Sequence, residues 1–190
     1  MFATDTAIPF TSSMTVLKLL CQNAKQNPTS AGSRRVFTYA TLQKLVFIAH
    51  GLYLAKYSSP LIKEPVLVTE QGPIFEDIEN ERQANHEVNS DAITEYSSHD
   101  LGVEQSAYNF IKMIFDIYVL EKKFPCEKLD YYTLGLNSDW HNIYKIAVIA
   151  DDFVLPNSII QTRFEDDLET SYLTSYDVNA FRHHHKKTAA

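Results

Sequence analysis

His50 is the residue whose type and position could carry chemistry in this chain. It interrupts an apolar run from Leu45 to Ala55, and a helix that is apolar on nearly every side is normally buried. At 3.6 residues per turn, Gln43 and His50 fall on one stripe of this helix, with Lys44 beside them. A neutral imidazole near a lysine could act as a general base. The alternative is a structural histidine whose ring nitrogens bond to Gln43 or to the backbone near Gly72. We favour the structural histidine, because buried polar groups are normally hydrogen-bonded.

The helix that carries this stripe is the centre of the predicted fold. Thr38 is a suitable residue to begin it, and Ser58-Ser59-Pro60 is a sequence that ends helices. The apolar run is too short to span a bilayer, so we expect a core helix. A Val-rich segment at 65–70 then alternates as a strand does, and its expected partner lies at 61–63 or 93–96.

The Gly72-Pro73 pair predicts a corner after this strand, with Pro73 in the first turn of a helix that runs to about Gln83. Further apolar residues at helical spacing predict a mainly α fold, or α+β with a small hairpin or short sheet, compact around the central helix. The other predicted helices cover residues 12–27, 103–120, 125–132 and 156–168, and residues 140–147 are predicted as a short helix or a turn. The first of these helices is capped by Ser12 or Ser13, and its apolar face carries Val16, Leu19, Leu20 and Cys21.

Length and composition indicate one folded domain. The chain has 190 residues, of which 45% are hydrophobic, and this is enough for a proper core. We expect a flexible N-terminal tail at residues 1–11, a single helical domain at 12–170 and a polar C-terminal tail at 171–190. The N-terminal residues lack a charged-then-apolar signal pattern, which favours a cytoplasmic protein.

Charge and motifs narrow the classes of function. A net charge of −7 disfavours nucleic acid as a ligand, since phosphate binding needs clustered Lys and Arg. It suits a basic protein partner. Cys21 and Cys126 lack metal-ligand spacing, which favours reduced thiols. Phosphate-loop, dinucleotide, zinc-protease and serine-hydrolase motifs are absent from the sequence, so we expect no cofactor, no metal and no catalysis.

Four short motifs and a distal tryptophan occur in a fixed order along the chain. They are Leu42-Gln43-Lys44-Leu45, Ala49-His50, Pro60-Leu61, Gly72-Pro73 and Trp140. With these motifs the chain resembles the Panacea antitoxin domain, a family associated with phages and toxin–antitoxin systems, over residues 14–164. Asp139 stands where that family has a proline, and Thr133 is followed by Leu134 rather than by histidine.

The resemblance implies an antitoxin that neutralises a toxin encoded nearby, by direct protein–protein contact and without chemistry of its own. The expected partner surface combines an acidic helix with an aromatic turn, because acidic residues steer a basic partner and aromatic residues anchor interfaces. A tryptophan in a small domain is nevertheless more often part of the core. The residues expected at this surface are Glu76, Asp77, Glu79, Trp140 and Tyr144.

Two other classes of function stay open at the level of sequence. One is a non-catalytic regulatory or nucleic-acid-associated protein, which would need a basic face. The other is an enzyme, which would need a concave pocket that holds His50 with Lys44 or an acidic partner. We expect no membrane association, and assembly into a homo-oligomer is also open.

Overall fold

A computed structural model describes residues 11–28, 37–84, 102–121, 129–130, 133 and 139–170, and of these it leaves out the side chains of Asp139 and of 166–170. The described chain is mostly helical and carries a small antiparallel sheet, which confirms the predicted fold class. Its elements are α1 (Ser13–Gln26), α2 (Tyr39–Tyr57), β1 (Val66–Thr69), β2 (Gly72–Ile74), α3 (Glu76–Ala84), α4 (Gln105–Phe115), the π-helix η1 (Asp116–Glu121), α6 (Asp139–Ala150), β3 (Val154–Leu155) and α7 (Asn157–Thr170).

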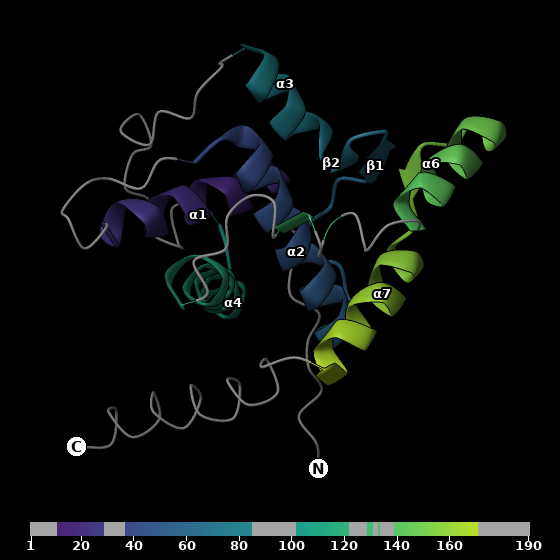
Figure 1. The fold of residues 1–190 in the computed structure, drawn as a ribbon. Helices are drawn as coiled ribbons and strands as arrows, with labels where there is room; N and C mark the ends of the chain where they lie inside the picture. The colour runs from purple at the N-terminus through teal and green to yellow at the C-terminus, as the bar shows by residue number, and fades with distance from the viewer. Residues whose placement is uncertain are drawn as a thin grey trace, which may run out of the picture.

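Helix α2 is the centre of the fold, as predicted. Thr38 caps its start, where the Thr41 backbone N–H donates to the Thr38 hydroxyl at 3.2 Å. Ser58 ends it in the left-handed conformation, with its own N–H bonded to the Leu54 carbonyl at 2.8 Å. In Figure 1, α2 runs through the middle of the molecule, with α1 and α4 on one side and α7 on the other. These helices thereby cover the apolar side chains around α2.

Helix α1 begins after Ser12, one of the two residues predicted as its cap. The Thr15 backbone N–H donates to the Ser12 hydroxyl at 3.1 Å, which satisfies one of the free donors at a helix start. Its predicted apolar face is buried, with Val16, Leu19 and Leu20 fully enclosed. Helix α1 therefore packs that face against α2 and α4.

The sheet differs from the prediction in the partners of its central strand. The order is β2-β1-β3, with Leu67 opposite Ile74 on one side and opposite Val154 on the other. The predicted partner at 61–63 instead forms an isolated parallel bridge, from Ile62 to Thr11. Thr11 is buried there, although we assigned it to the N-terminal tail. The other predicted partner, 93–96, lies outside the described residues.

The Gly72-Pro73 pair also differs from the prediction. Both residues belong to strand β2 rather than to a helix start, and Pro73 lies opposite Val68. Proline is tolerated here because β2 is an edge strand. Gly72 has a φ of 129°, which L side chains rarely adopt. The following helix, α3, begins only at Glu76.

The predicted helix at 103–120 is α-helical only as far as Phe115 and continues as the π-helical η1. The predicted helices near Trp140 and Asn157 are present as α6 and α7. Most of the predicted helix at 125–132 lies outside the described residues. No described helix has the length and apolar character that crossing a membrane requires.

Contact between α2 and α7 depends on Gly51. A Cβ placed on Gly51 would lie 2.2 Å from two ring carbons of Phe164, so the glycine lets the ring lie directly on the helix backbone. The Phe164 ring is fully buried and meets Phe47 edge to face, with ring centroids 5.7 Å apart. The absent side chain at position 51 is therefore what sets how closely the two helices approach.

Gly51→Ala should destabilise the fold by about 1–3 kcal/mol, the usual cost of overpacking a core. In an unhindered helix the same change stabilises by up to about 1 kcal/mol, so the sign of the effect is diagnostic. Urea unfolding of the single variant and of Gly51→Ala in a Phe164→Ala background measures it. In that background the alanine should be neutral or stabilising. A stabilising effect in the otherwise unchanged chain would contradict the packing account.

Candidate functional site

The His50 side chain is fully buried, and both of its ring nitrogens are hydrogen-bonded. The Ile62 backbone N–H donates to Nδ1 at 3.2 Å. Nε2 lies 3.2 Å from Oδ1 of Asn157. Because Nδ1 accepts this hydrogen bond, a neutral ring must carry its own hydrogen on Nε2, so Nε2 donates to Asn157. His50 thus joins α2 to the segment before β1 and to the first residue of α7.

Burial also controls the ionisation of His50. Desolvation lowers the pKa of the imidazole from 6.5 to about 4, and the hydrogen bond with Asn157 opposes this shift only in part. A neutral ring with both nitrogens occupied has no site left for a substrate proton. These bonds support a structural role for His50. The hydrogen-bond partners predicted for His50, Gln43 and the backbone near Gly72, were wrong.

The polar residues around His50 diverge instead of forming one constellation. The Gln43 side chain donates from Nε2 to the Phe75 carbonyl at 3.3 Å. Lys44 forms an ion pair with Asp130. His50 meets the same region through ring contact alone, with the Phe75 ring centroid 5.9 Å away. Gln43 and His50 therefore both contact Phe75, one position after β2, through the Phe75 carbonyl and the Phe75 ring respectively.

The remaining motif residues contribute to the core or to the sheet. Leu42 and Leu45 are fully buried, and Gly72 and Pro73 are buried within β2. Trp140 is only 7% exposed, and its indole Nε1–H donates to the Thr69 carbonyl at 2.8 Å. This burial corrects the placing of Trp140 among the residues that a partner contacts.

The other predicted surface residues lie in two different environments. Glu76 and Asp77 are exposed at the start of α3, where the helix dipole favours negative charge. Glu79 is partly buried and accepts hydrogen bonds from Arg82 and Gln83. The bond from Arg82 is the main reason that the pKa of Glu79 is lowered. Tyr144 packs partly buried against the core, so Glu76 and Asp77 are the two predicted surface residues that are exposed.

An exposed apolar surface, which the sequence reasoning missed, lies on α6, β3 and the first turn of α7. Six of the seven exposed large hydrophobic side chains in the described residues fall in the short stretch 146–159. Ile149 is 86% exposed and Ile146 is 65% exposed. The sequence signal for this surface was the run Ile-Ala-Val-Ile followed by Phe-Val-Leu, a pattern that is equally typical of buried core residues. The members of this apolar surface are Ile146, Val148, Ile149, Phe153, Val154 and Ile159.

The chain reversal between α6 and β3 holds this apolar surface together. Asp151 adopts a left-handed backbone with φ 52°, and the Asp152 N–H bonds to the Ala147 carbonyl at 3.1 Å. Such a bond across a left-handed residue closes a helix end firmly. The Phe153 carbonyl then accepts from the Val68 N–H at 2.7 Å, which attaches the turn to the sheet. The segments that carry the exposed residues of α6 and β3 are therefore hydrogen-bonded to each other and to the sheet.

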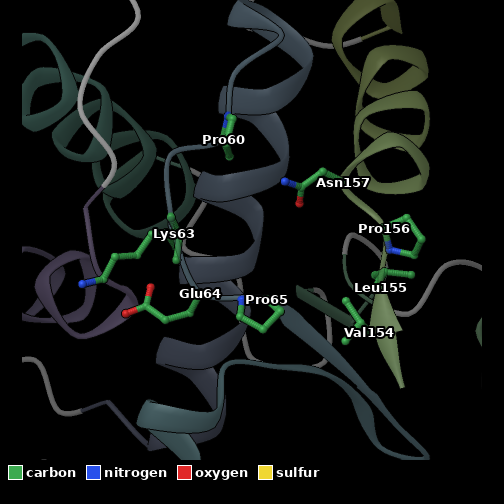
Figure 2. Close-up of a pocket in the computed structure, with 9 residues that line it drawn as sticks. Pro60, Lys63, Glu64, Pro65, Val154, Leu155, Pro156 and Asn157 are labelled. Atoms are coloured by element: carbon green, nitrogen blue, oxygen red, sulfur yellow. The ribbon is translucent and has the colours of Figure 1, made fainter. Parts of the chain in front are cut away.

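A cleft of about 400 Å³ adjoins the apolar surface. Figure 2 shows its two walls, the segment from Pro60 to Pro65 on one side and Val154 to Asn157 on the other. Both hydrogen-bond partners of His50, Ile62 and Asn157, line it. Val154 belongs to the cleft and to the apolar surface, so the two features are continuous.

Within the described residues, no group of three or more His, Cys, Asp or Glu side chains is arranged to hold a metal ion. Cys21 is buried, and desolvation raises the pKa of its thiol to about 12, which disfavours the reactive thiolate. Comparison with protein-family models, with curated proteins and with solved structures found no match. Among the described residues, the apolar surface and the cleft are the two features that we consider as binding sites.

The low pKa of His50 predicts a dependence of stability on pH. His50 takes up a proton near pH 6.5 in the unfolded chain but only near pH 4 in the folded chain, because burial lowers its pKa. The free energy of unfolding therefore has its full value above pH 6.5 and falls as the pH drops from 6.5 toward 4. The full loss is about 3 kcal/mol, from 1.36 kcal/mol per pKa unit. Urea unfolding at a series of pH values measures it.

His50→Gln is the matched control for this measurement, because it keeps a polar side chain and removes the titration. Carboxylates contribute their own acid sensitivity to both proteins, so the difference between the two curves isolates His50. The difference should shrink from neutral pH toward pH 4. Parallel curves would show that His50 is not held neutral in the folded protein.

Proposed function

We propose that this chain is an antitoxin that binds and neutralises a toxic protein encoded nearby, acting in the cytoplasm by direct contact and without catalysis. The observation that carries the proposal is the apolar surface, with Ile149 86% exposed and Ile146 65% exposed. Large exposed apolar patches mark interaction sites in soluble proteins. The resemblance to the Panacea antitoxin domain supports the choice of a toxin as the partner.

The energetics of the apolar surface suit a protein partner. Burying apolar area yields about 25 cal/mol per Å², and a few well-packed anchors usually supply most of the affinity at an interface. The ordered turn at Asp151 and Asp152 holds these anchors before binding. Binding would then cost less conformational entropy than it would for a loose segment.

The acidic charge has a separate part in this proposal. A net charge of −7, with Glu76 and Asp77 exposed on α3, would attract a basic toxin from a distance. Charges at the rim of an interface mainly raise the association rate. The apolar surface would then provide the affinity, and α3 would provide the speed.

The alternatives are less well supported by the described residues. An enzyme built on His50 and Lys44 would need a free ring nitrogen, whereas both nitrogens are bonded and Lys44 is paired with Asp130. A nucleic-acid-associated protein would need a basic face, in conflict with the net charge. A second copy of this chain could also cover the apolar surface, and the oligomeric state in solution distinguishes that case.

Ile146→Asp combined with Ile149→Asp should abolish neutralisation of the neighbouring gene product. Both side chains point outward, so the fold should persist, while carboxylates placed at a desolvated contact should weaken binding by about 100-fold or more. The measurements are growth of cells that express the neighbour with each variant, and calorimetric binding of the purified pair.

The matched control is Ser106→Asp with Asn109→Asp, which adds the same two charges at exposed positions of α4. It should neutralise as well as the unchanged chain does. A harmless neighbour, or one that stays toxic beside the folded unchanged chain, would refute the antitoxin function. If the isoleucine variant breaks a dimer of this chain yet still neutralises, the apolar surface is a contact between copies instead.

Glu76→Lys combined with Asp77→Lys should slow association with the toxin and weaken its salt dependence. The dissociation rate should change little, because these exposed carboxylates act at a distance. Stopped-flow binding at several salt concentrations measures both rates. An unchanged association rate would show that the carboxylates of α3 do not attract the toxin, and the apolar surface alone would remain as the proposed contact.

A further inference from the structure

The cleft begins where two strands of the sheet separate. The last pair of the β1–β3 ladder is Val66 opposite Leu155, and beyond it the chain of 60–65 and the chain of 156–157 diverge. Pro60, Pro65 and Pro156 line the opening, and none of them can donate a backbone hydrogen bond. Ile62 and Leu155 are almost fully buried within it. The walls of the cleft are thus largely apolar and low in donors.

Lys63 and Glu64 also line the cleft, but their charged ends are directed elsewhere. Glu64 accepts a hydrogen bond through Oε2 from the Ser13 backbone N–H at 3.2 Å, so its carboxylate belongs to the start of α1. Figure 2 shows Lys63 and Glu64 reaching away from Asn157 and Leu155. The side chain that gives the cleft a directed polar group is therefore Asn157.

A chain of hydrogen bonds fixes how the Asn157 carboxamide is turned. The Ile62 N–H occupies Nδ1 of His50, so the hydrogen of the neutral ring is on Nε2. Nε2–H needs an acceptor, and that acceptor must be the carboxamide oxygen of Asn157. The NH₂ group is then the end of the carboxamide that remains for another partner. A backbone N–H on one wall thus determines which group the other wall presents.

We propose that this cleft binds an extended apolar segment of the partner protein, and that the Asn157 NH₂ group donates to a main-chain carbonyl of that segment. This inference rests on the proposed function, because the cleft continues the apolar surface through Val154. A volume of about 400 Å³ is within the usual range of ligand sites, about 300–1,000 Å³. An apolar wall with one oriented donor suits a peptide, which offers apolar side chains and a carbonyl at every residue.

The first experiment uses a small probe and does not need the partner. N-acetyl-leucine methylamide has one apolar side chain and two peptide carbonyls, and a fragment of this size should bind with a Kd of about 1 mM. Titration into ¹⁵N-labelled full-length protein should shift the Asn157 side-chain NH₂ signals and the backbone amides of 154–157 in a saturable way. The NH₂ signals of Asn109 on α4 should stay in place.

Asn157→Asp tests the donor itself. The aspartate keeps an acceptor for His50 and replaces the NH₂ group by oxygen, and a carboxylate at the start of α7 also suits the helix dipole, so the fold should be retained. Probe affinity should fall by about 10-fold or more, since the carbonyl loses its donor and faces a negative oxygen. Asn109→Asp is the matched control, because its Oδ1 likewise accepts a hydrogen bond, from Gln105 at 2.9 Å; this variant should bind the probe normally.

The outcomes separate this inference from the proposed function. Unsaturable shifts, or equal probe affinity in Asn157→Asp and Asn109→Asp, would overturn the peptide cleft even if the chain neutralises its neighbour. Saturable binding that needs Asn157 supports the cleft even if the neighbour proves harmless. With the neighbouring gene product as the ligand, Asn157→Asp should lower affinity by about 10-fold or more, and an unchanged affinity would mean that the partner does not enter the cleft.

Discussion

A buried imidazole that accepts one hydrogen bond and donates another connects the parts of this protein. His50 receives the Ile62 N–H on one ring nitrogen and gives a hydrogen to Asn157 from the other. Ile62 lies in the segment before β1, and Asn157 begins α7, 107 residues along the chain from His50. Because the ring works in this way only when neutral, its burial and its low pKa are part of the same arrangement. The two walls of the cleft are held by one side chain of the central helix.

The surroundings of His50 depend on close helix packing. Gly51 lets the Phe164 ring lie against the backbone of α2, at a distance that any side chain would prevent. This contact brings α7 near enough for Asn157 to reach His50. Directly after α6, the left-handed turn at Asp151 returns the chain to the sheet, and Ile149 in the last turn of α6 stays exposed. The close-packed core therefore supports the exposed apolar side chains of α6 and β3.

Local patterns predicted most of the elements. The caps at Ser12 and Thr38 and the buried central helix followed from capping chemistry and from an apolar run that leaves no polar face. The strand at 65–70 was predicted, but its partners were not, because β3 has only two residues and lies far along the chain from β1. Pairings of that kind depend on tertiary packing, and a Gly-Pro pair reads as a helix start as readily as an edge strand.

The candidate site was predictable only in part, for a related reason. The apolar neighbours of His50 in the sequence predicted that it is buried. They did not predict its hydrogen-bond partners, since Ile62 offers a backbone group and Asn157 is brought near by α7. Ile146 and Ile149 are apolar residues on an apolar helix, and sequence does not tell which apolar face lacks a cover. Trp140 shows the converse, because an aromatic residue suited to an interface is held inside by the Thr69 carbonyl.

The most direct test of this account is the protonation of His50 in solution. A long-range ¹H–¹⁵N correlation spectrum, with the His50 signals assigned by comparison with His50→Gln, reports which ring nitrogen carries hydrogen. The account predicts a neutral ring with hydrogen on Nε2 and a bare Nδ1 at neutral pH, and this state should persist as the pH falls toward 4. An imidazolium at neutral pH, or a hydrogen on Nδ1, would contradict the bond from Ile62 and with it the orientation of Asn157.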